Sequence, residues 1–489
     1  MKSNYICLKF LIASLFTLNF FSSEAQTRQI TLEGAIIIAQ KNSLDYKVAF
    51  NQYQSDLWNF KNYQSLFLPT LELEGTIPSY TRSINRITLP NGEDAFVAQN
   101  QSYSSLNLGI RQRVGITGGI VSMNTVLNRI DIFGQSRQGS YSVVPFSISY
   151  YQNTVGFNEF KWTKRTEPLR YELSRRQLQN SMEGIAGQSV DYYFEVISSQ
   201  NQRLLSRQNL INSQNLLRIA NERFKLGTVS QGEILQIRLN ILNAQNQVRE
   251  DSINFVLAKQ KFSAYLDTKD EDWELELPDK INFYTINFDN ALEQAKKNGQ
   301  EILAFRLKRI EAERQLAQTK ASNGLKFNIQ ANFGVSNTST NFSSLLNNLA
   351  NQQNITLGFS VPILDWGMAK TQRLRAEADL SIVKNQNDQK NREVEQEIAL
   401  QIAKWNMHRT VFQTAVEAKD IADKSYQLEL QRYSKGSISI NDLNVAQSQK
   451  DAASASYIQS IKKYWQLLYT IRKLTLYDFY KNENVAIVQ

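Results

Sequence analysis

The feature that most limits the possible folds of this chain is the long stretch from Met368 to Phe479, which contains no proline and one glycine, Gly436. Because glycine and proline are the residues that most disfavour a helix interior, the backbone can stay helical everywhere except at that glycine. The pattern predicts a helical hairpin whose first arm, 368–435, is about 100 Å long at roughly 1.5 Å per residue. Apolar residues recur on this arm at helical spacing, at Val394, Ile398, Ile402 and Trp405. An arm with one apolar stripe must pack against other helices.

The residues around Gly436 have a counterpart 209 positions earlier, around Gly227. A second similarity, at an offset of 256 positions, relates the helix that begins near Phe288 to the helix that begins near Leu32. We therefore predict a tandem repeat, with a first unit at 26–286, a second unit at 287–479 and a tail at 480–489. The matched pairs at the two glycines are Arg223 with Arg432, Phe224 with Tyr433, Gly227 with Gly436, and Glu233 with Asp442.

The first 25 residues have the features of a secretory signal peptide. A basic start precedes the apolar run Phe10–Phe21, which is too short for a transmembrane helix, and small residues stand at Ser23 and Ala25. The only cysteine, Cys7, lies in this segment, so the mature chain is expected to have no disulfide and no amino-terminal lipid. The net charge of +9 is mild for 489 residues, and no basic block interleaved with aromatics supports a nucleic-acid partner.

Alternation of apolar residues with polar or small ones predicts strands in both repeats. The first repeat has four such segments, at 71–77, 106–110, 121–127 and 144–150, and the second has two, at 327–335 and 355–361. The extra pair lies around Gly118 and Gly119, which are predicted to form a hairpin turn. The polar stretches at 82–102, 128–141 and 337–354 are predicted to be turn-rich loops. Aromatics at the strand ends favour an outer-membrane barrel, with a soluble sandwich as the alternative.

Three more helices are predicted, at 30–68 with Thr31 as its cap, at 161–226 and at 230–267. The acidic segment 268–286 is predicted to link the repeats without a helix. Asp365 is predicted to cap the helix that begins near Met368. The only histidine, His408, lies on the long arm, so neither a histidine metal cluster nor a histidine-based catalytic triad is expected. We expect no enzyme activity and no cofactor.

Together these elements resemble the TolC family of outer-membrane efflux proteins. The resemblance rests on the opening helix at 30–33, Pro69 after it, the strand-to-helix corner at 361–367 and both glycine-centred tips. It extends from 26 to about 479. The fold that it implies is an α+β membrane protein: a tandem repeat of long antiparallel helical hairpins forms a trimeric α-barrel, and the strands contribute to one shared outer-membrane β-barrel in contact with lipid.

The resemblance also implies a function, that of a passive homotrimeric exit duct in a tripartite efflux or secretion system. Its tips would dock on a periplasmic adaptor, or membrane fusion protein, which is coupled to an inner-membrane transporter. A single chain has too few strands to close a roomy barrel, and lipid does not tolerate an open edge, which independently favours an oligomer. The alternative is a periplasmic coiled-coil scaffold or adaptor without a membrane barrel. A porin that works alone would leave the tips without a purpose.

By resemblance, functional residues are expected at the tips. The adaptor-docking residues would be Gly227, Thr228, Val229, Ser230, Gly436, Ser437, Ile438 and Ser439. The periplasmic aperture, or gate, would be formed by Glu233, Tyr433 and Asp442, with Tyr433 bonded to Glu233 in the closed state. A local role stays open for both acids, because Ser230 with Glu233 and Ser439 with Asp442 have the spacing of a capping box. Gly232, Ile438 and Val445 depart from the family pattern and imply fewer polar ties.

Overall fold

The computed structural model describes residues 28–134, 137–153, 156–268, 273–278 and 281–486, and the predicted signal peptide lies outside these residues. The chain divides into two compact units. The sheet unit contains Ala49–Asn180 and Asp289–Ala399, and the helical unit contains Ser181–Phe288, Leu400–Val485 and the chain up to Val48. Each unit is therefore built from both predicted repeats. None of the described helices combines the length and the hydropathy needed to cross a membrane.

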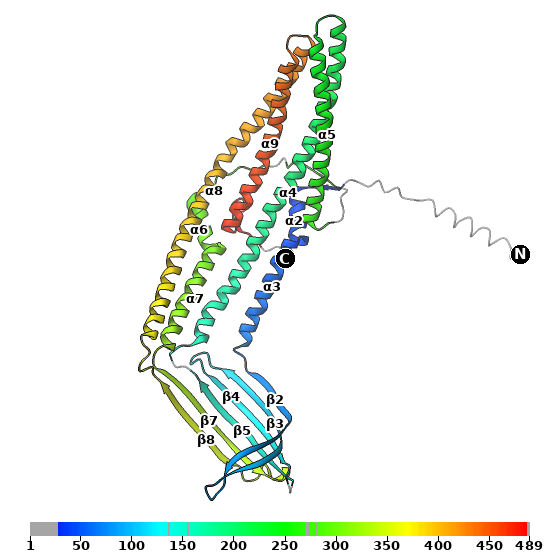
Figure 1. Ribbon diagram of the computed structural model, residues 1–489. Helices are drawn as coiled ribbons and strands as arrows, with labels where there is room; N and C mark the ends of the chain where they lie inside the picture. Colours follow the sequence, from blue (N-terminus) through cyan, green and yellow to red (C-terminus); the bar gives the residue numbers. More distant parts are fainter. Residues whose placement is uncertain (1–27, 135–136, 154–155, 269–272, 279–280, 487–489) are drawn as a thin grey trace, which may run out of the picture. The chain divides into compact units, whose positions relative to one another are not determined.

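The sheet unit contains one antiparallel sheet of six strands in the order β2-β3-β4-β5-β7-β8 (Figure 1). All six predicted strands are present, four from the first repeat and two from the second. In the β3–β4 turn the Val114 amide donates a hydrogen bond to the Gly119 carbonyl at 2.8 Å, and Gly118 has φ +83°, as the hairpin prediction requires. The strand bounds are β2 Thr70–Thr88, β3 Asp94–Arg113, β4 Ile120–Ile132, β5 Gln138–Gln152, β7 Lys326–Ser339 and β8 Ala350–Ser360.

The predicted loops at 82–102 and 128–141 are wrong over most of their length, whereas the loop predicted at 337–354 is present between β7 and β8, at 340–349. The strand ladder continues through polar sequence, and β2 and β3 stay paired as far as Thr88 and Asp94. Polar side chains stabilise this part of the ladder across the strands, since Arg86 forms an ion pair of 2.5 Å with Asp94. Backbone pairing does not need regular apolar alternation, so the pattern missed the rest of each strand, even where it carries apolar residues such as Ile84 and Phe96. The helix η1 (Phe342–Ser344) lies in the third of these segments.

The two faces of the sheet differ in chemistry. Directly paired residues lie on the same face, so the register defines rows across neighbouring strands. One row is apolar and 38–66% exposed, and the row beside it, on the opposite face, is polar or small. The apolar row is Leu71, Ile110, Met123, Ile148 and Phe333, and it ends on β8 with Gln353. The polar row is Glu72, Gly109, Asn124, Ser147, Gly334 and Gln352.

The predicted helix 30–68 is two helices, α2 (Leu32–Asn42) and α3 (Leu44–Ser65). The break is Ser43, whose ψ of 152° is extended and whose hydroxyl accepts a hydrogen bond from the Tyr46 amide, which caps α3. Thr31 caps α2 as predicted, by accepting from the Gly34 amide. Of the second repeat, α6 (Phe288–Asn298) and α7 (Gln300–Ser322) show the same division into two helices.

Two long helical hairpins pass into the helical unit (Figure 1). The first is α4 (Glu159–Lys225) with α5 (Gln231–Leu266), and the second is α8 (Met368–Ser434) with α9 (Ile440–Thr475). Asp365 caps α8 as predicted, since its carboxylate accepts from the Gly367 and Ala369 amides at 2.9 and 2.8 Å. The predicted link between the repeats contains β6 (Trp273–Leu275), which pairs in parallel with β1 (Arg28–Ile30).

The core of the helical unit is rich in aromatic side chains. Tyr193, Phe262 and Trp273 pack edge to face around the β1–β6 pair, and Tyr193 donates a hydrogen bond to the Glu276 carbonyl. His408 is buried beside Phe283, and its Nε2 lies 2.8 Å from the Ser460 carbonyl oxygen. Burial lowers the pKa of His408. This histidine is therefore a neutral core residue.

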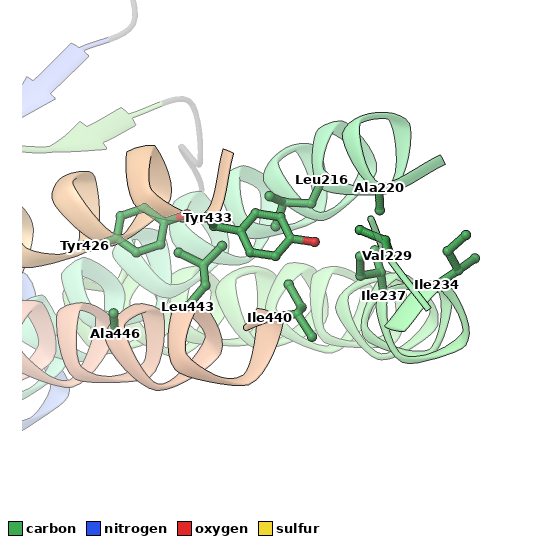
Figure 2. Packing of buried hydrophobic residues seen from close by; sticks show 10 residues of the cluster. All are labelled: Leu216, Ala220, Val229, Ile234, Ile237, Tyr426, Tyr433, Ile440, Leu443 and Ala446. Atoms are coloured by element: carbon green, nitrogen blue, oxygen red, sulfur yellow. The ribbon is translucent and has the colours of Figure 1, made fainter. Parts of the chain in front are cut away.

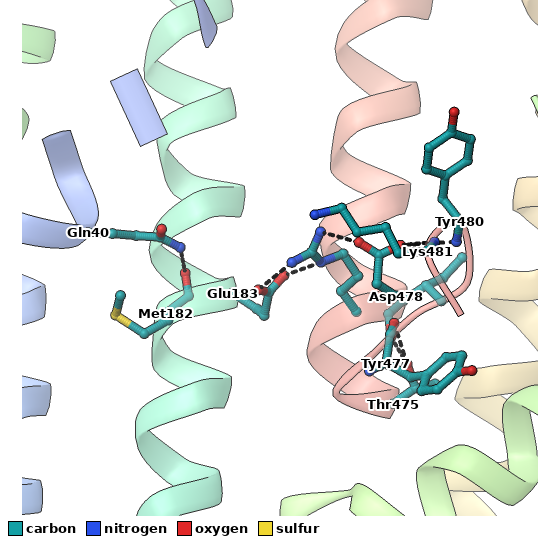
Figure 3. A network of polar contacts seen from close by, with 10 residues as sticks. Gln40, Met182, Glu183, Thr475, Tyr477, Asp478, Tyr480 and Lys481 are labelled. Atoms are coloured by element: carbon teal, nitrogen blue, oxygen red, sulfur yellow. Dashed lines mark hydrogen bonds and ion pairs between the residues drawn. The ribbon is translucent and has the colours of Figure 1, made fainter. Parts of the chain in front are cut away.

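A buried ion-pair network fastens α9 to α4 (Figure 3). The Arg472 guanidinium binds both carboxylate oxygens of Glu183, at 2.8 and 3.1 Å, and reaches Asp478 at 3.0 Å. Asp478 belongs to β9 (Tyr477–Asp478), which pairs with β10 (Glu483–Asn484). The tail is consequently ordered beyond 479, and the described part of it returns to pack on the end of α9.

Candidate functional site: the paired helical tips

The first tip connects α4 to α5. Gly227 has φ +77°, a backbone conformation that favours glycine, and its amide donates to the Phe224 carbonyl at 2.9 Å. The Thr228 amide closes the turn by donating to the Arg223 carbonyl at 3.0 Å. Ser230 then caps α5, because its hydroxyl accepts from the Glu233 amide at 3.2 Å.

The second tip connects α8 to α9 with the same backbone pattern. Gly436 has φ +81°, and its amide donates to the Tyr433 carbonyl at 2.9 Å. Ser439 caps α9 by accepting from the Asp442 amide at 3.3 Å, and Asp442 Oδ2 accepts from both the amide and the hydroxyl of Ser439, at 3.0 and 2.8 Å. This is a complete capping box. These hydrogen bonds hold the pKa of the Asp442 carboxyl below its usual value.

Glu233 behaves differently from its counterpart Asp442. Its carboxylate contacts the second hairpin, where the Tyr433 hydroxyl donates to Glu233 Oε1 at 2.9 Å. Tyr433 has no exposed surface, and burial together with the bond to Glu233 raises the pKa of its hydroxyl. The hydroxyl therefore stays protonated as a hydrogen-bond donor at physiological pH.

Arg223 adds a second polar link between the hairpins. Its Nη1 donates to the Tyr433 carbonyl at 3.1 Å, and its guanidinium carbon lies 5.6 Å from the centre of the Tyr433 ring. Arg223 and Glu233, both from the first hairpin, thus hold one residue of the second. Arg223 is the repeat counterpart of Arg432 but was not among the predicted site residues.

A cluster of buried apolar side chains lies beside these polar links (Figure 2). All four helices contribute to it, so both hairpins are packed together close to their turns. Val229, predicted to be an exposed docking residue, is 7% exposed and belongs to this cluster, and Ile438 is partly buried against it. The cluster consists of Leu216, Ala220, Val229, Ile234, Ile237, Tyr426, Tyr433, Ile440, Leu443 and Ala446.

The other predicted docking residues, among them Thr228 and Ser437, are exposed. The first tip also exposes two larger apolar side chains that the prediction omitted, Phe224 at 45% and Leu226 at 77%. Of the three predicted gate residues, Glu233 and Tyr433 are in direct contact, whereas the bonds of the Asp442 carboxylate stay within its own hairpin. The tips thus combine a fixed interior with an exposed surface of mixed polarity.

Comparisons with known proteins agree with this architecture. Residues 291–475 match the family model described as outer membrane efflux protein. The Campylobacter jejuni CmeC outer membrane channel is similar in structure, with a TM-score of 0.65 and 16% identity over 91% of this chain and 85% of that one. The outer membrane protein VceC of Vibrio cholerae has a TM-score of 0.60 and 14% identity over 91% and 95%. No sequence among the curated proteins matches this chain.

A third similar structure is the open state of the Neisseria gonorrhoeae MtrE outer membrane channel, with a TM-score of 0.58 and 13% identity over 91% of this chain and 88% of that one. The fold of this chain is that of the outer-membrane channels, and the family match lies in its second half. The match of residues 291–475 to the outer membrane efflux protein family and the shared fold confirm the resemblance to the TolC family. This family and the similar structures are channel proteins rather than enzymes.

Proposed function

We propose that three copies of this protein form one passive exit duct of a tripartite efflux or secretion system, across the outer membrane and the periplasm. The exposed apolar row of the sheet carries the proposal. Five neighbouring strands place large apolar side chains on one face, as expected where strands meet lipid, and small or polar residues on the other, as expected for a water-filled lumen. A soluble sandwich, the alternative, would bury that face within the chain.

The edges of the sheet support an assembly of several copies. Among the described strands, β2 and β8 each pair on one side only. Lipid offers no hydrogen-bond partner to an open edge, so β2 of one copy would pair with β8 of the next until the sheet closes. The outer-membrane lipid would then surround one shared barrel.

The helical hairpins support the same assembly. On α5 an apolar stripe in two parts, before and after the largely polar segment 243–252, is 49–60% exposed in the single chain. Groups of exposed apolar side chains on one helix face mark an interface with another protein. We assign it to the neighbouring copies of the homotrimer. The stripe consists of Leu235, Leu239, Leu242, Ile253, Val256 and Leu257.

The tips would dock on the periplasmic adaptor, which would connect the duct to an inner-membrane transporter. Their exposed residues, Gly227, Thr228, Ser230, Gly436, Ser437 and Ser439, would contact the adaptor, while Val229 and Ile438 would support the turns from inside. Energy for export would come from the transporter, since the duct itself only opens and closes.

Glu233, Tyr433 and Asp442 would form the gate at the periplasmic mouth. Three copies of each carboxylate would attract cations to this constriction. The bond from Tyr433 to Glu233 would hold the hairpins of each copy together in the closed state.

Single-channel conductance of the detergent-purified protein in planar lipid bilayers tests this function. We expect small, cation-selective openings from the wild type, and larger, less selective openings from Glu233→Ala with Asp442→Ala. A matched control, Asp420→Ala with Asp423→Ala, removes two carboxylates from the α8 surface that pair with lysines on their own helix, and should leave selectivity unchanged. Unchanged conductance in the tip variant would mean that Glu233 and Asp442 only stabilise their own helix ends and do not act in the gate. A folded protein without channels would refute the duct.

A further inference from the structure

The two long hairpins match each other residue by residue. Helices α4 and α8 both have 67 residues, α5 and α9 both have 36, and the starts of each pair differ by the repeat offset of 209 positions. Every position of the first hairpin therefore has a counterpart in the second. In the helical unit, far from the tips, one pair of positions differs in chemistry: Ser199 and Asp251 of the first hairpin correspond to His408 and Ser460 of the second.

In the second repeat this place is filled by the chain itself. The His408 side chain is buried beside Phe283, and its Nε2 donates a hydrogen bond to the Ser460 carbonyl at 2.8 Å. The Ser460 hydroxyl donates to the Tyr457 carbonyl at 2.7 Å. The imidazole occupies the space between α8 and α9, and a neutral ring satisfies its partner, because that partner is a backbone carbonyl.

In the first repeat the corresponding place is open. A cavity of about 560 Å³ is lined by residues of α4, α5 and α9, and both Ser199 and Asp251 belong to its wall. Ser199 has a short side chain whose hydroxyl donates to the Val196 carbonyl of its own helix at 2.9 Å. It does not fill the space that an imidazole takes in the second repeat.

The Asp251 carboxylate has an acceptor that the chain leaves unused. Asp251 is 3% exposed, and its Oδ1 accepts from Gln247 Nε2 at 2.9 Å, whereas its buried Oδ2 has no hydrogen-bond partner among the described residues. A buried carboxylate oxygen without a donor is costly. Lys462 lines the same cavity, but its ammonium group binds Asp191 at 3.1 Å. A donor from outside the chain would complete the site.

The remaining wall of the cavity indicates the kind of donor. Phe194 and Ile458 supply apolar surface, and Asn201 and Asn254 supply amide groups. One carboxylate beside apolar and amide groups suits an organic cation, whose charged N–H group would face Asp251 while its carbon atoms pack on the apolar wall. A metal ion fits less well, because the described residues include no group of three or more acidic, histidine or cysteine side chains that could hold one.

We propose that this cavity binds a small organic cation through a charge-assisted hydrogen bond from its ammonium, or a similar charged N–H group, to Asp251 Oδ2. The first repeat thus keeps an acid and an open space where the second repeat has a histidine and a backbone acceptor. All the residues that form the cavity lie in the helical unit of one chain, so the site does not depend on the proposed duct.

Isothermal titration calorimetry of the detergent-purified mature protein with benzylamine tests the proposal. At pH 7 this probe is an ammonium ion with a ring that can pack on the apolar wall. We expect one site per chain, and at least about tenfold weaker binding of benzyl alcohol, which has a similar shape and no charge. Asp251→Asn should weaken benzylamine binding at least about tenfold. Asp420→Asn is the matched control, since this exposed carboxylate pairs with Lys424 on its own helix.

A second pair of variants exchanges the two repeats at this position. Ser199→His places an imidazole where the second repeat has His408, so it should abolish benzylamine binding and raise the midpoint of thermal unfolding by giving Asp251 a donor. His408→Ser opens the corresponding space in the second repeat, where no carboxylate is present, and should add no second site.

Equal binding of benzylamine and benzyl alcohol, or equal binding of benzylamine to the wild type and to Asp251→Asn, would overturn the proposal. Benzylamine binding that survives Ser199→His would do the same. Loss of the trimer in Asp251→Asn would also contradict it, because a cationic side chain of a neighbouring copy would then fill the cavity. None of these measurements needs an open channel, so failure of the duct would be recognised separately in planar bilayers.

Discussion

Removal of the Tyr433 hydroxyl is the most specific test of the hydrogen bond from Tyr433 to Glu233, which joins the two hairpins. Tyr433→Phe keeps the ring in the apolar cluster at the tips and deletes only the group that donates to Glu233 at 2.9 Å. The bond from Arg223 to the Tyr433 backbone carbonyl is unaffected by this change. Any effect on gating therefore reports the single hydrogen bond between the side chains.

The magnitude follows from the partners of that hydroxyl. A hydrogen bond to a charged group contributes about 1.5–3 kcal/mol net. Glu233 is half-buried, so water replaces part of the lost bond, and we expect a loss of about 1–2 kcal/mol from the closed state. This corresponds to an increase of about 5- to 30-fold in the ratio of open to closed channels.

The assay is the open probability of single channels in planar bilayers, measured as a double-mutant cycle with Tyr433→Phe and Glu233→Ala. We expect the double variant to open no more often than the stronger single variant. Tyr426→Phe is the matched control: it removes a hydroxyl in the same cluster that accepts a bond from Asn212, a neutral partner, so its effect should be smaller. Fully additive effects of the two substitutions on the open probability, or no effect at all, would show that this hydrogen bond does not hold the channel closed.

Four other outcomes are expected. Gly436→Ala should cost about 1–2 kcal/mol, because φ +81° is strained for an L-residue, and should speed hydrogen exchange at the second tip. Because bonds to Ser439 lower the pKa of Asp442, its contribution is present above the ordinary aspartate pKa of 3.8 and lost as pH falls through the lowered value, so exchange at this tip should rise in acid, except in Asp442→Asn. Arg472→Met should cost about 3–5 kcal/mol in thermal unfolding, because it leaves a buried glutamate unpaired. Ile148→Arg should cost about 2–4 kcal/mol and impair insertion into lipid, whereas Glu74→Arg on the polar face should be tolerated; equal insertion of both would contradict the face assignment.

The long helices and both tips could be predicted from sequence because their signals are local. A proline-free helical stretch broken at Gly436, and its copy at Gly227, defined the hairpins to within a few residues. Glycine at positive φ and serine at the cap act within one turn of chain, so neighbouring residues sufficed.

Features that depend on distant residues were predicted less well. The strands continue beyond their apolar alternation because a neighbouring strand supplies the hydrogen bonds, which no local pattern reveals. Likewise, Glu233 and Asp442 have the same capping spacing, yet only Asp442 completes its box. The partner of Glu233 lies 200 positions away, and the resemblance to a family, rather than the spacing, indicated that partner.

Electron cryomicroscopy of the purified protein in lipid nanodiscs tests the central claim most directly. The account predicts particles with threefold symmetry, with the strands of three chains closed into one barrel inside the disc and the helical hairpins outside the lipid. A protein that stays in solution without lipid or detergent, or a single chain whose sheet packs on itself outside the disc, would contradict the account and favour the periplasmic scaffold.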